Sequence, residues 1–468
     1  MQQSKPNIVF ITSDQHRGDT LGCAGHPCVR TPHLDKLAMS GVRFDRAYAD
    51  CPVCIPQRTT IVTGIQSHRY GMPEYAQQYR IDRPRELFLG SLLTRAGYQT
   101  QIVGKTHWHT EPTFRGGFEG VEGEAEFNDW ARARTGIGRA DRSGIGMNEP
   151  FPDWSHVPQE WTMTNWVMDR SIRFLEYRDR TQPFFLWASV IDPHPPNTVH
   201  EPYYSMYDHE DVPEPNVPEW IHEELCPYGL RRHREVWNSV RMKSKALRKA
   251  RGVYYGMVTH IDHQIGRLLG KLRSEGQLDN TWIVYASDHG EMLGDLDDSG
   301  KSTFMEPSAN VPLIICPPRD FSLGLGETCE ALVGLDDLFA TFCSIAGAET
   351  PADITGRDLL PLIRGEAGEV RHELHGQIGH SHMFHTGGYK YLYFAEDGKE
   401  LLFDAVHDRL EQHPLNGNLE LLASVRERFL AHLQEEGNEY VADGRLVNLN
   451  VAQQTDRELR RTNVYGWH

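Results

Sequence analysis

Apolar, β-branched runs alternate along most of the chain with segments of helical periodicity. Strand-like runs include NIVFIT, YQTQIVG, FFLWASVI and WIVYAS, at residues 7–12, 98–104, 184–191 and 282–287. Residues 250–276 place apolar side chains at spacings of three and four, which predicts a long amphipathic helix ending near Gly276. This alternation predicts an α/β fold with a large mixed, mostly parallel sheet flanked by helices.

Two shorter helices are marked by their end signals. Residues 31–41, TPHLDKLAMSG, predict a helix that Thr31 caps. Residues 57–64, QRTTIVTG, predict a helix ending at Gly64, with Pro56 favouring its first turn. Cys54 is then expected just before a helix N-terminus, where backbone N–H groups favour negative charge and lower the pKa of a thiol.

The pattern changes near residue 365. Short alternating strands follow, in GGYKYLYFAEDGKELLFDAV at residues 387–406, and then a helix around residues 418–435 and a polar tail. This predicts a small antiparallel sheet with a helix. We therefore expect a catalytic α/β domain over residues 1–365 and a C-terminal α+β subdomain over residues 366–468.

Polar residues follow each of the four strand-like runs. In open α/β sheets, ligands bind beyond the carboxyl ends of the strands, so these residues are expected to face one crevice. Taken singly, an aspartate after a strand is more often a helix cap, and a histidine more often structural. Four strand ends that all carry such residues favour a ligand-binding site. The residues are Ser13 and Asp14, Lys105 and His107, Asp192 and His194, and Asp288 and His289.

Two chemical roles divide these residues. Asp14, Asp288 and His289 are expected to bind a metal, with mostly oxygen donors favouring a hard divalent cation. The basic residues are expected to bind an anion and to carry protons. These are Lys105, His107, His194 and Lys301.

Composition narrows the function classes. The chain has 468 residues and a formal net charge of −17, which argues against nucleic acid as a partner. No apolar run approaches the roughly 20 residues that span a bilayer, so no membrane partner is expected. The N-terminal residues show no secretory signal pattern, and we expect a cytoplasmic protein. Eight cysteines are too few for a disulfide scaffold. The sequence does not determine the oligomeric state, and an oligomer is possible.

The segment CPVCIPQR, residues 51–58, is where three interpretations meet. The C-x-x-C spacing of Cys51 and Cys54 permits a thiol redox pair or a zinc site. Structural zinc needs further ligands, and no second C-x-x-C pair is present. The alternative uses Cys54 alone, because Pro56 and Arg58 stand at C-x-P-x-R spacing from it.

This motif resembles that of the type I, formylglycine-dependent sulfatases of the alkaline phosphatase superfamily. Four further segments resemble motifs of the family in the same order: SDQHRGDTLGCAGHPCVRTPHLDKLA, GKTHWH, DPHPP, and SDHGEMLGD followed by Lys301. Together with Cys54 they extend over most of the chain. The resemblance implies an alkaline phosphatase-like fold and hydrolysis of a sulfate monoester, with a sulfated carbohydrate or an aryl sulfate expected as substrate.

The resemblance also implies a cofactor and a set of roles. A formylglycine-generating enzyme would convert Cys54 to formylglycine. One divalent metal would be bound nearby. Calcium is expected first, and manganese or another divalent ion is the alternative. Arg58, Lys105 and Lys301 would neutralise the sulfuryl oxygens. His194 would protonate the leaving alcohol, and His107 would help to release sulfate. The implied metal ligands are Asp14, Cys54, Asp288 and His289.

The chain departs from the family pattern at three places. Ser13 stands where family members often have a second aspartate, and His289 where many have asparagine. Asp297 and Asp298 lie close to Lys301, where they would repel an anion unless they face hydroxyls, a cation or solvent. A phosphonate monoester or phosphodiester hydrolase is therefore the main alternative, and a non-catalytic sulfate-binding relative is another.

Two further segments invite interpretation. Residues 230–252 concentrate Lys and Arg, which indicates a solvated helical face or a flank for a polyanionic saccharide, and exposed aromatics such as Tyr203, Tyr204 and Trp237 favour a saccharide. Residues 372–385 contain five histidines. We expect these to form a pocket rim or plain surface, with a second metal site as the alternative, because the segment has no supporting Cys or carboxylate pattern.

Overall fold

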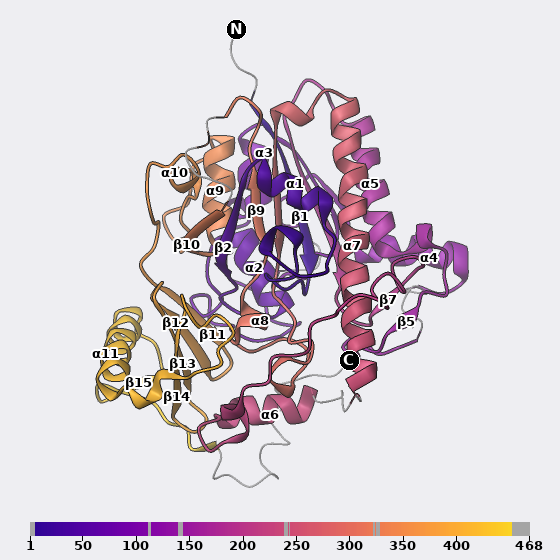
Figure 1. Ribbon diagram of the computed structural model, residues 1–468. Coiled ribbons are helices and arrows are strands. Elements are labelled where there is room, and N and C mark those ends of the chain that lie inside the picture. The colour runs from indigo at the N-terminus through magenta and orange to yellow at the C-terminus, as the bar shows by residue number, and fades with distance from the viewer. Residues whose placement is uncertain are drawn as a thin grey trace.

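The structure is a computed structural model that describes residues 5–110, 114–138, 144–237, 242, 244–321, 323 and 328–451. Its centre is an eight-stranded sheet in the order β10-β2-β9-β8-β1-β6-β3-β4 (Figure 1). Only β9 runs antiparallel to its neighbours in this sheet. The strands are β1 (Asn7–Asp14), β2 (Val42–Tyr48), β3 (Gln99–Gly104), β4 (Gly120–Glu122), β6 (Phe184–Pro193), β8 (Thr281–Ser287), β9 (Leu313–Cys316) and β10 (Thr328–Gly334).

Helices cover both faces of this sheet (Figure 1). Successive side chains of β1 alternate between the faces: Val9 and Ile11 pack against one helical layer, and Ile8 and Phe10 against the other. The first layer contains α1 (Pro32–Met39), α4 (Glu124–Thr135), α5 (Met163–Tyr177) and α7 (Ser244–Ser274). The second contains α2 (Cys54–Thr63), α3 (Leu89–Arg95), α9 (Asp337–Ala346) and α10 (Leu360–Ile363). The predicted mixed, mostly parallel α/β fold is confirmed.

A second, antiparallel sheet of four strands carries α11 (Leu419–Glu436) on one face. Tyr391 and Leu402 point toward α11, whereas Leu392 and Leu401 pack toward the main sheet. The predicted small sheet with a helix is thus confirmed. Its strands are β11 (Leu374–Ile378), β12 (Ser381–His385), β13 (Tyr389–Phe394) and β14 (Lys399–Asp404).

The predicted domain division at residue 365 lies in the connection between α10 and β11. The two parts share one apolar cluster, in which Tyr48 of β2 and Phe304 contact residues of the second sheet. The division itself stays a prediction. The remaining elements are β5 (Asp153–Trp154), β7 (Thr198–Val199), α6 (Tyr228–Trp237), α8 (Glu306–Ala309), β15 (Val441–Ala442) and β16 (Arg445–Leu446).

Two helix starts differ from the sequence prediction. α2 begins at Cys54 itself, because Val53 is the extended residue before the helix and Pro56 fits the first turn, where its missing N–H is not needed. At α1, Thr31 holds the N-cap position without capping the helix. Instead, the Asp262 carboxylate of α7 accepts hydrogen bonds from the His33 and Leu34 N–H groups, a partner too distant in sequence to predict.

The predicted polar tail follows α11; its first part is described and contains β15 and β16, and the rest, from residue 452 onward, lies outside the described residues. Within the described part of the chain, no helix has both the length and the apolar character needed to cross a membrane.

Candidate active site

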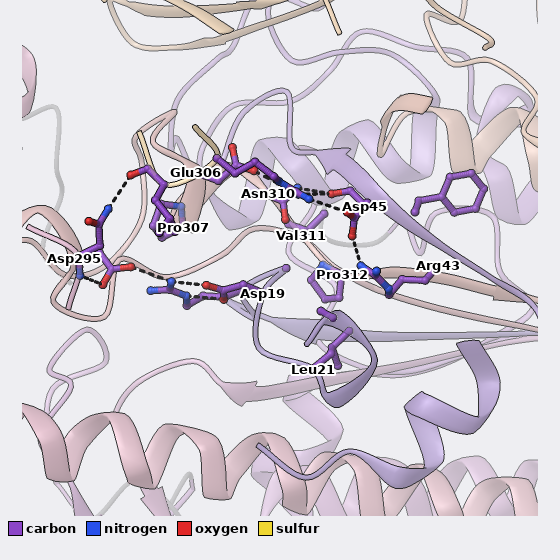
Figure 2. A pocket seen from close by; sticks show the side chains of 17 residues that line it. Asp19, Leu21, Arg43, Asp45, Asp295, Glu306, Pro307, Asn310, Val311 and Pro312 are labelled. Atoms are coloured by element: carbon purple, nitrogen blue, oxygen red, sulfur yellow. Dashed lines mark hydrogen bonds and ion pairs between the residues drawn. The ribbon is translucent and has the colours of Figure 1, made fainter. Parts of the chain in front are cut away.

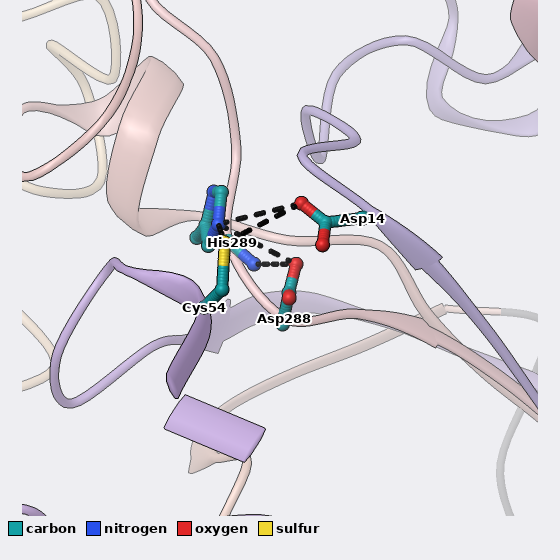
Figure 3. A group of neighbouring side chains, drawn as sticks. All are labelled: Asp14, Cys54, Asp288 and His289. Carbon is teal, nitrogen blue, oxygen red and sulfur yellow. Dashed lines mark hydrogen bonds and ion pairs between the residues drawn. The ribbon is translucent and has the colours of Figure 1, made fainter. Parts of the chain in front are cut away.

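The carboxyl ends of β8, β1, β6 and β3 meet at one edge of the sheet, because these four strands are parallel neighbours. Asp14 ends β1, while Asp288 and His289 follow β8. Cys54, the first residue of α2, faces them (Figure 3). These four side chains are buried, and their potential ligand atoms lie within 4.8 Å of one another. The sequence prediction had named this same set.

Cys54 lies at the centre of this cluster. Its Sγ is 3.2 Å from His289 Nε2 and 3.7 Å from Asp14 Oδ1. The other ring nitrogen of His289, Nδ1, donates to the Gly290 carbonyl at 3.0 Å. Burial lowers the pKa of His289, but Asp288 and Cys54 raise it above the usual value, so this imidazole adds positive charge beside Cys54. Burial raises the pKa of the Cys54 thiol, but Lys105, Lys301 and His289 outweigh it and hold that pKa well below the usual value.

Arg58 joins the two carboxylates of the cluster. Its Nε donates to Asp288 Oδ2 at 2.6 Å, and Nη2 lies 3.4 Å from Asp14 Oδ2. The same guanidinium donates to Ser189 Oγ at 2.8 Å. Lys105 Nζ also contacts Asp14. Burial and Cys54 raise the pKa of Asp14, yet Lys105 and Arg58 keep it far below its usual range, so the carboxylate stays ionised.

Lys301 and His194 form a second pair beside Cys54. Lys301 Nζ donates to His194 Nε2 at 2.6 Å and to Gln15 Oε1 at 2.7 Å. Burial, with Lys301 adding to it, lowers the pKa of His194 to about 3, so this imidazole is neutral. Sequence reasoning missed Gln15 and its partner Glu291. The only signal for Gln15 was its place directly after Asp14.

Three of the residues predicted at this site lie outside the buried metal-ligand cluster. His107 is more exposed than the cluster, lies 3.4 Å from Glu124 and is among the groups that lower the Cys54 pKa. Asp192 accepts a hydrogen bond from Thr164 at 2.6 Å, and Ser13 Oγ accepts one from Tyr285 at 3.0 Å. Neither Asp192 nor Ser13 belongs to the metal-ligand cluster.

Asp298 lies in a buried ion pair. His233 of α6 pairs with it, with Nδ1 2.6 Å from Oδ2, and the other ring nitrogen contacts the Lys301 carbonyl. Burial lowers the pKa of His233, but Asp298 raises it above its usual value. Asp297 is exposed and lies 3.2 Å from His222. The repulsion expected near Lys301 is therefore offset for Asp298 by a histidine from the basic segment.

A cavity of about 540 Å³ is lined by residues that adjoin Cys54 and Lys301 in the chain, although neither of these two residues nor any other member of the cluster lines it. Val53 borders it next to Cys54, and Ser302 and Thr303 border it next to Lys301. Further walls come from α6, from residues 71–75 and from the turn between β11 and β12. Its charged and aromatic lining residues include Glu74, Tyr75, Tyr228, Arg232, Glu396, Glu439 and Tyr440.

The aromatic residues expected at a saccharide site lie elsewhere. Tyr203, Tyr204 and Trp237 do not line this cavity, and both Tyr203 and Trp237 are buried. Tyr203 packs against His260 and lies 3.0 Å from His263 Nδ1, so it belongs to the packing around α7. Residues 238–241 and 243 of the basic segment lie outside the described residues.

A smaller cavity of about 220 Å³ shares no lining residue with the larger one. Figure 2 shows the side chains that line it. Ion pairs line it: Arg17 with Asp19 and Asp295, and Arg43 with Asp45. None of the predicted site residues borders it. Its charged side chains are already paired with one another, so we assign the active site to the cluster around Cys54.

The two cysteines of CPVCIPQR differ in environment. All eight cysteines of the chain are free thiols. Cys51 is buried outside the metal-ligand cluster, and burial and Asp50 raise its pKa well above the usual value. A thiol redox or zinc pair is therefore disfavoured, because only Cys54 has an activated environment.

The donor set of the cluster fits a divalent cation. Asp14 and Asp288 offer carboxylate oxygens and His289 an imidazole nitrogen. Arg58 pairs with both carboxylates and Lys105 with Asp14, which offsets part of the repulsion between the two carboxylates. Such mixed oxygen and nitrogen donors suit calcium, manganese and related ions.

Comparisons with known proteins agree with this geometry. An arylsulfatase of Clostridium perfringens is 35% identical over 436 residues, covering 87% of this chain and 89% of that protein. An N-acetylglucosamine-6-O-sulfatase of Bacteroides thetaiotaomicron is 27% identical over 509 residues, covering 94% and 87%. The solved structure of a phosphonate monoester hydrolase of Agrobacterium radiobacter matches with a TM-score of 0.81 and 25% identity, covering 92% and 96%.

A family model described as Sulfatase matches residues 6–348. The match extends from the start of β1 through α9, and it includes every candidate residue of the cluster around Cys54. The resemblance seen in the sequence is confirmed: this chain belongs to the sulfatase family, whose members are sulfuric ester hydrolases.

Proposed function

We propose that this protein hydrolyses sulfate monoesters of hydroxylated compounds, using formylglycine made from Cys54 and one divalent cation. The observation that carries the proposal is the position of Cys54 at the N-terminus of α2, among Asp14, Asp288 and His289. A formylglycine-generating enzyme would carry out the maturation, with dioxygen as the oxidant: the Cβ–S bond of Cys54 breaks, the sulfur leaves as sulfide, and Cβ becomes the aldehyde carbon.

The nucleophile would come from position 54. As a hydrated aldehyde, this residue would present one hydroxyl for in-line attack on sulfur and a second whose deprotonation releases sulfate by C–O cleavage. A divalent cation bound by Asp14, Asp288 and His289 would supply positive charge that lowers the pKa of the attacking hydroxyl. Calcium is our first choice of ion, with manganese second.

The surrounding side chains would carry charge and protons. Lys105 and Lys301 both lower the pKa of Cys54 and would bind the sulfuryl oxygens, whose charge grows in the transition state. Arg58 would hold Asp14 and Asp288 in place for the cation. The proton for the departing alkoxide would come from the Lys301–His194 pair, in which Lys301 already donates to the neutral imidazole. His107, at the more exposed edge, would accept the proton that accompanies sulfate release.

The cavity of about 540 Å³ is our candidate site for the alcohol portion of the substrate. Glu74, Glu396 and Glu439 give it acidic walls, and tyrosines add hydroxyl groups. Acidic walls disfavour a polyanionic chain and favour a saccharide with a single sulfate, because carboxylates accept hydrogen bonds from sugar hydroxyls. The N-acetylglucosamine-6-O-sulfatase relative supports a sulfated sugar, and the arylsulfatase relative supports activity on aryl sulfates.

A phosphonate monoester hydrolase is the second candidate function. The Agrobacterium radiobacter enzyme of that class shares the fold, and His289 in the metal cluster departs from the asparagine of many sulfatases. Sulfuryl and phosphoryl groups are both tetrahedral and differ mainly in charge. We favour the sulfatase because the relative with 35% identity is an arylsulfatase.

Two measurements test the proposed function. The first is the mass of the tryptic peptide of residues 47–58 from protein made in a host with the modifying enzyme. We expect an aldehyde at Cys54 and an intact thiol at Cys51, and two thiols or a disulfide in active protein would exclude the mechanism. The second compares hydrolysis of 4-nitrophenyl sulfate and 4-nitrophenyl phenylphosphonate. A large preference for the phosphonate would reverse our choice.

A further inference from the structure

A second cluster of metal-binding side chains lies where the C-terminal sheet meets the turn after α2. His68 belongs to that turn, His375 to β11, and Glu436 is the last residue of α11. One potential ligand atom from each of the three lies within 4.8 Å of the others. The His68 side chain is 2% exposed, His375 1% and Glu436 13%. Three segments distant in sequence thus bring two imidazoles and a carboxylate to one buried point.

Two of the three separations, each measured to a different oxygen of Glu436, are close to the edge length of a coordination tetrahedron, and all three ligand atoms lie within 4.8 Å of one another. Glu436 Oε1 lies 3.3 Å from His68 Nε2, and Oε2 lies 3.0 Å from His375 Nδ1. Metal–nitrogen and metal–oxygen bonds near 2.0 Å give tetrahedral edges of about 3.3 Å. His432 Nε2 is also 3.3 Å from Glu436 Oε1. A cation could therefore be bound without a large movement of the backbone.

The hydrogen bonds around His375 fit a metal ligand. His375 Nε2 lies 3.2 Å from His382 Nδ1. When Nδ1 of His375 binds a cation, its single proton moves to Nε2 and is donated to His382, as metal-bound imidazoles usually donate to a partner behind them. His68 Nδ1 and His382 Nε2 have no hydrogen-bond partner among the described residues. Hydrogen bonds between the described residues therefore leave one ring nitrogen unsatisfied on each of these two histidines.

The histidine-rich segment had not been expected to bind a metal, because it contains no suitable carboxylate. Glu436, from the far end of α11, supplies the missing ligand. The five histidines of the segment have separate surroundings: His372 pairs with Glu369 on the surface, His375 and His382 join the cluster, His380 lines the substrate cavity, and His385 packs against Tyr48.

We propose that His68, His375 and Glu436 bind a divalent transition metal of the zinc class, with water in a fourth position. Two nitrogens and one oxygen suit zinc better than calcium, which prefers oxygen donors. Arg69 Nη1, 3.4 Å from Glu436 Oε1, partly neutralises the carboxylate in the metal-free protein. The ion would join β11 and α11 to the turn that follows the catalytic helix. Residues 377–381 line the substrate cavity directly after His375, so the ion would also fix that wall.

Zinc content of the full-length protein tests the proposal. Chelator-treated protein is equilibrated with Zn²⁺ in excess Ca²⁺, which competes for the oxygen-rich active site, and bound zinc is counted by elemental analysis. We expect His68→Gln and Glu436→Gln each to lose one equivalent of zinc. His380→Gln, a change in the turn between β11 and β12, should lose none. Equal zinc content in all four proteins would overturn the proposal.

A measurement on the unmutated protein covers the case in which a variant fails to fold. Crystals soaked in Zn²⁺ should give an anomalous scattering peak between His68, His375 and Glu436. The absence of a peak at saturating zinc would exclude the site. Neither experiment depends on formylglycine or on sulfatase activity, so the metal site and the proposed function can fail separately.

Discussion

Lys301 Nζ lies 2.6 Å from His194 Nε2, and both side chains are buried beside Cys54. The imidazole is neutral, because burial and the nearby ammonium lower its pKa to about 3. The hydrogen bond from the Lys301 ammonium to the neutral His194 imidazole places one transferable proton between the two nitrogen atoms. This arrangement can deliver the proton to a departing alkoxide while the positive charge remains beside the sulfuryl group.

His194→Ala should therefore slow the enzyme most on substrates with a poor leaving group. General acid catalysis contributes about 10²–10⁴-fold, so kcat/KM for an alkyl or sugar sulfate should fall within that range. The loss should be much smaller for 4-nitrophenyl sulfate, since nitrophenolate leaves without a proton. His372→Gln, on an exposed histidine, is the control. An equal loss on both substrates would argue against a proton-donating role.

The two cysteines of CPVCIPQR should respond in opposite ways to replacement. Cys54→Ala should abolish hydrolysis, because neither formylglycine nor a thiolate can then form at the centre of the cluster. Cys51→Ala should keep most of the activity, because Cys51 lies outside that cluster and burial raises its pKa well above the usual value. The assay is 4-nitrophenyl sulfate turnover. Loss of activity in a folded Cys51→Ala protein would revive the paired-thiol interpretation.

The His233–Asp298 pair should make stability depend on pH. Asp298 raises the pKa of His233 in the folded protein, against the opposing effect of burial, so the folded state holds this proton more tightly than the unfolded state. The resulting stabilisation is complete below the unfolded pKa of about 6.5 and is lost as pH rises through the raised folded value. Unfolding by urea at several pH values should show this loss in the natural protein.

His233→Gln supplies the comparison for that measurement. The change leaves Asp298 buried without its cation, and we expect a destabilisation of about 3 kcal/mol at pH 6, with a smaller difference at high pH. His222→Gln, which removes the exposed partner of Asp297, should change stability little. If the difference in free energy of unfolding between the natural protein and His233→Gln stayed constant across this pH range, the His233–Asp298 pair would not titrate there.

Sequence reasoning reached the fold and the centre of the site for the same reason. Apolar runs mark buried strands, and parallel strands bring the residues after them to one edge, so Asp14, Asp288 and His289 could be placed together in advance. Contacts between side chains from segments far apart in the chain could not be predicted in this way. His233 reaches Asp298 from α6, and Glu436 reaches His68 from α11, through packing between segments far apart in the chain. Pairing of this kind leaves no local periodicity to detect.

Arg58→Lys should weaken metal binding at the active site. Lysine keeps the charge but has one ammonium group, which cannot contact Asp14, Asp288 and Ser189 together as the guanidinium does. Loss of such ligand-positioning contacts typically lowers metal affinity about 10–100-fold. The half-saturating Ca²⁺ concentration for activity, after chelator treatment, measures the effect. Arg267→Lys, in an exposed ion pair on α7, should leave it unchanged. An unchanged value in Arg58→Lys would contradict the role.

The acidic walls of the substrate cavity can be tested at Glu396. Burial raises its pKa to about 7, and its Oε2 has no hydrogen-bond partner among the described residues. The carboxylate therefore ionises near neutral pH and becomes a stronger acceptor for sugar hydroxyls. KM for glucose 6-sulfate should fall as pH rises through about 7. In Glu396→Gln the fall should disappear and KM should be higher by roughly 10-fold, the loss of one charged hydrogen bond.

Hydrolysis of 4-nitrophenyl sulfate, whose ring carries no hydroxyls, serves as the internal reference for Glu396→Gln. Its KM should be nearly equal in the natural protein and the variant, because the sulfuryl group contacts other residues. Glu435→Gln, on an exposed residue of α11, should behave as the natural protein with both substrates. A KM increase that is equal for the sugar and the aryl sulfate would indicate a general disturbance of the site. An unchanged KM for the sugar would place its hydroxyls against a different wall.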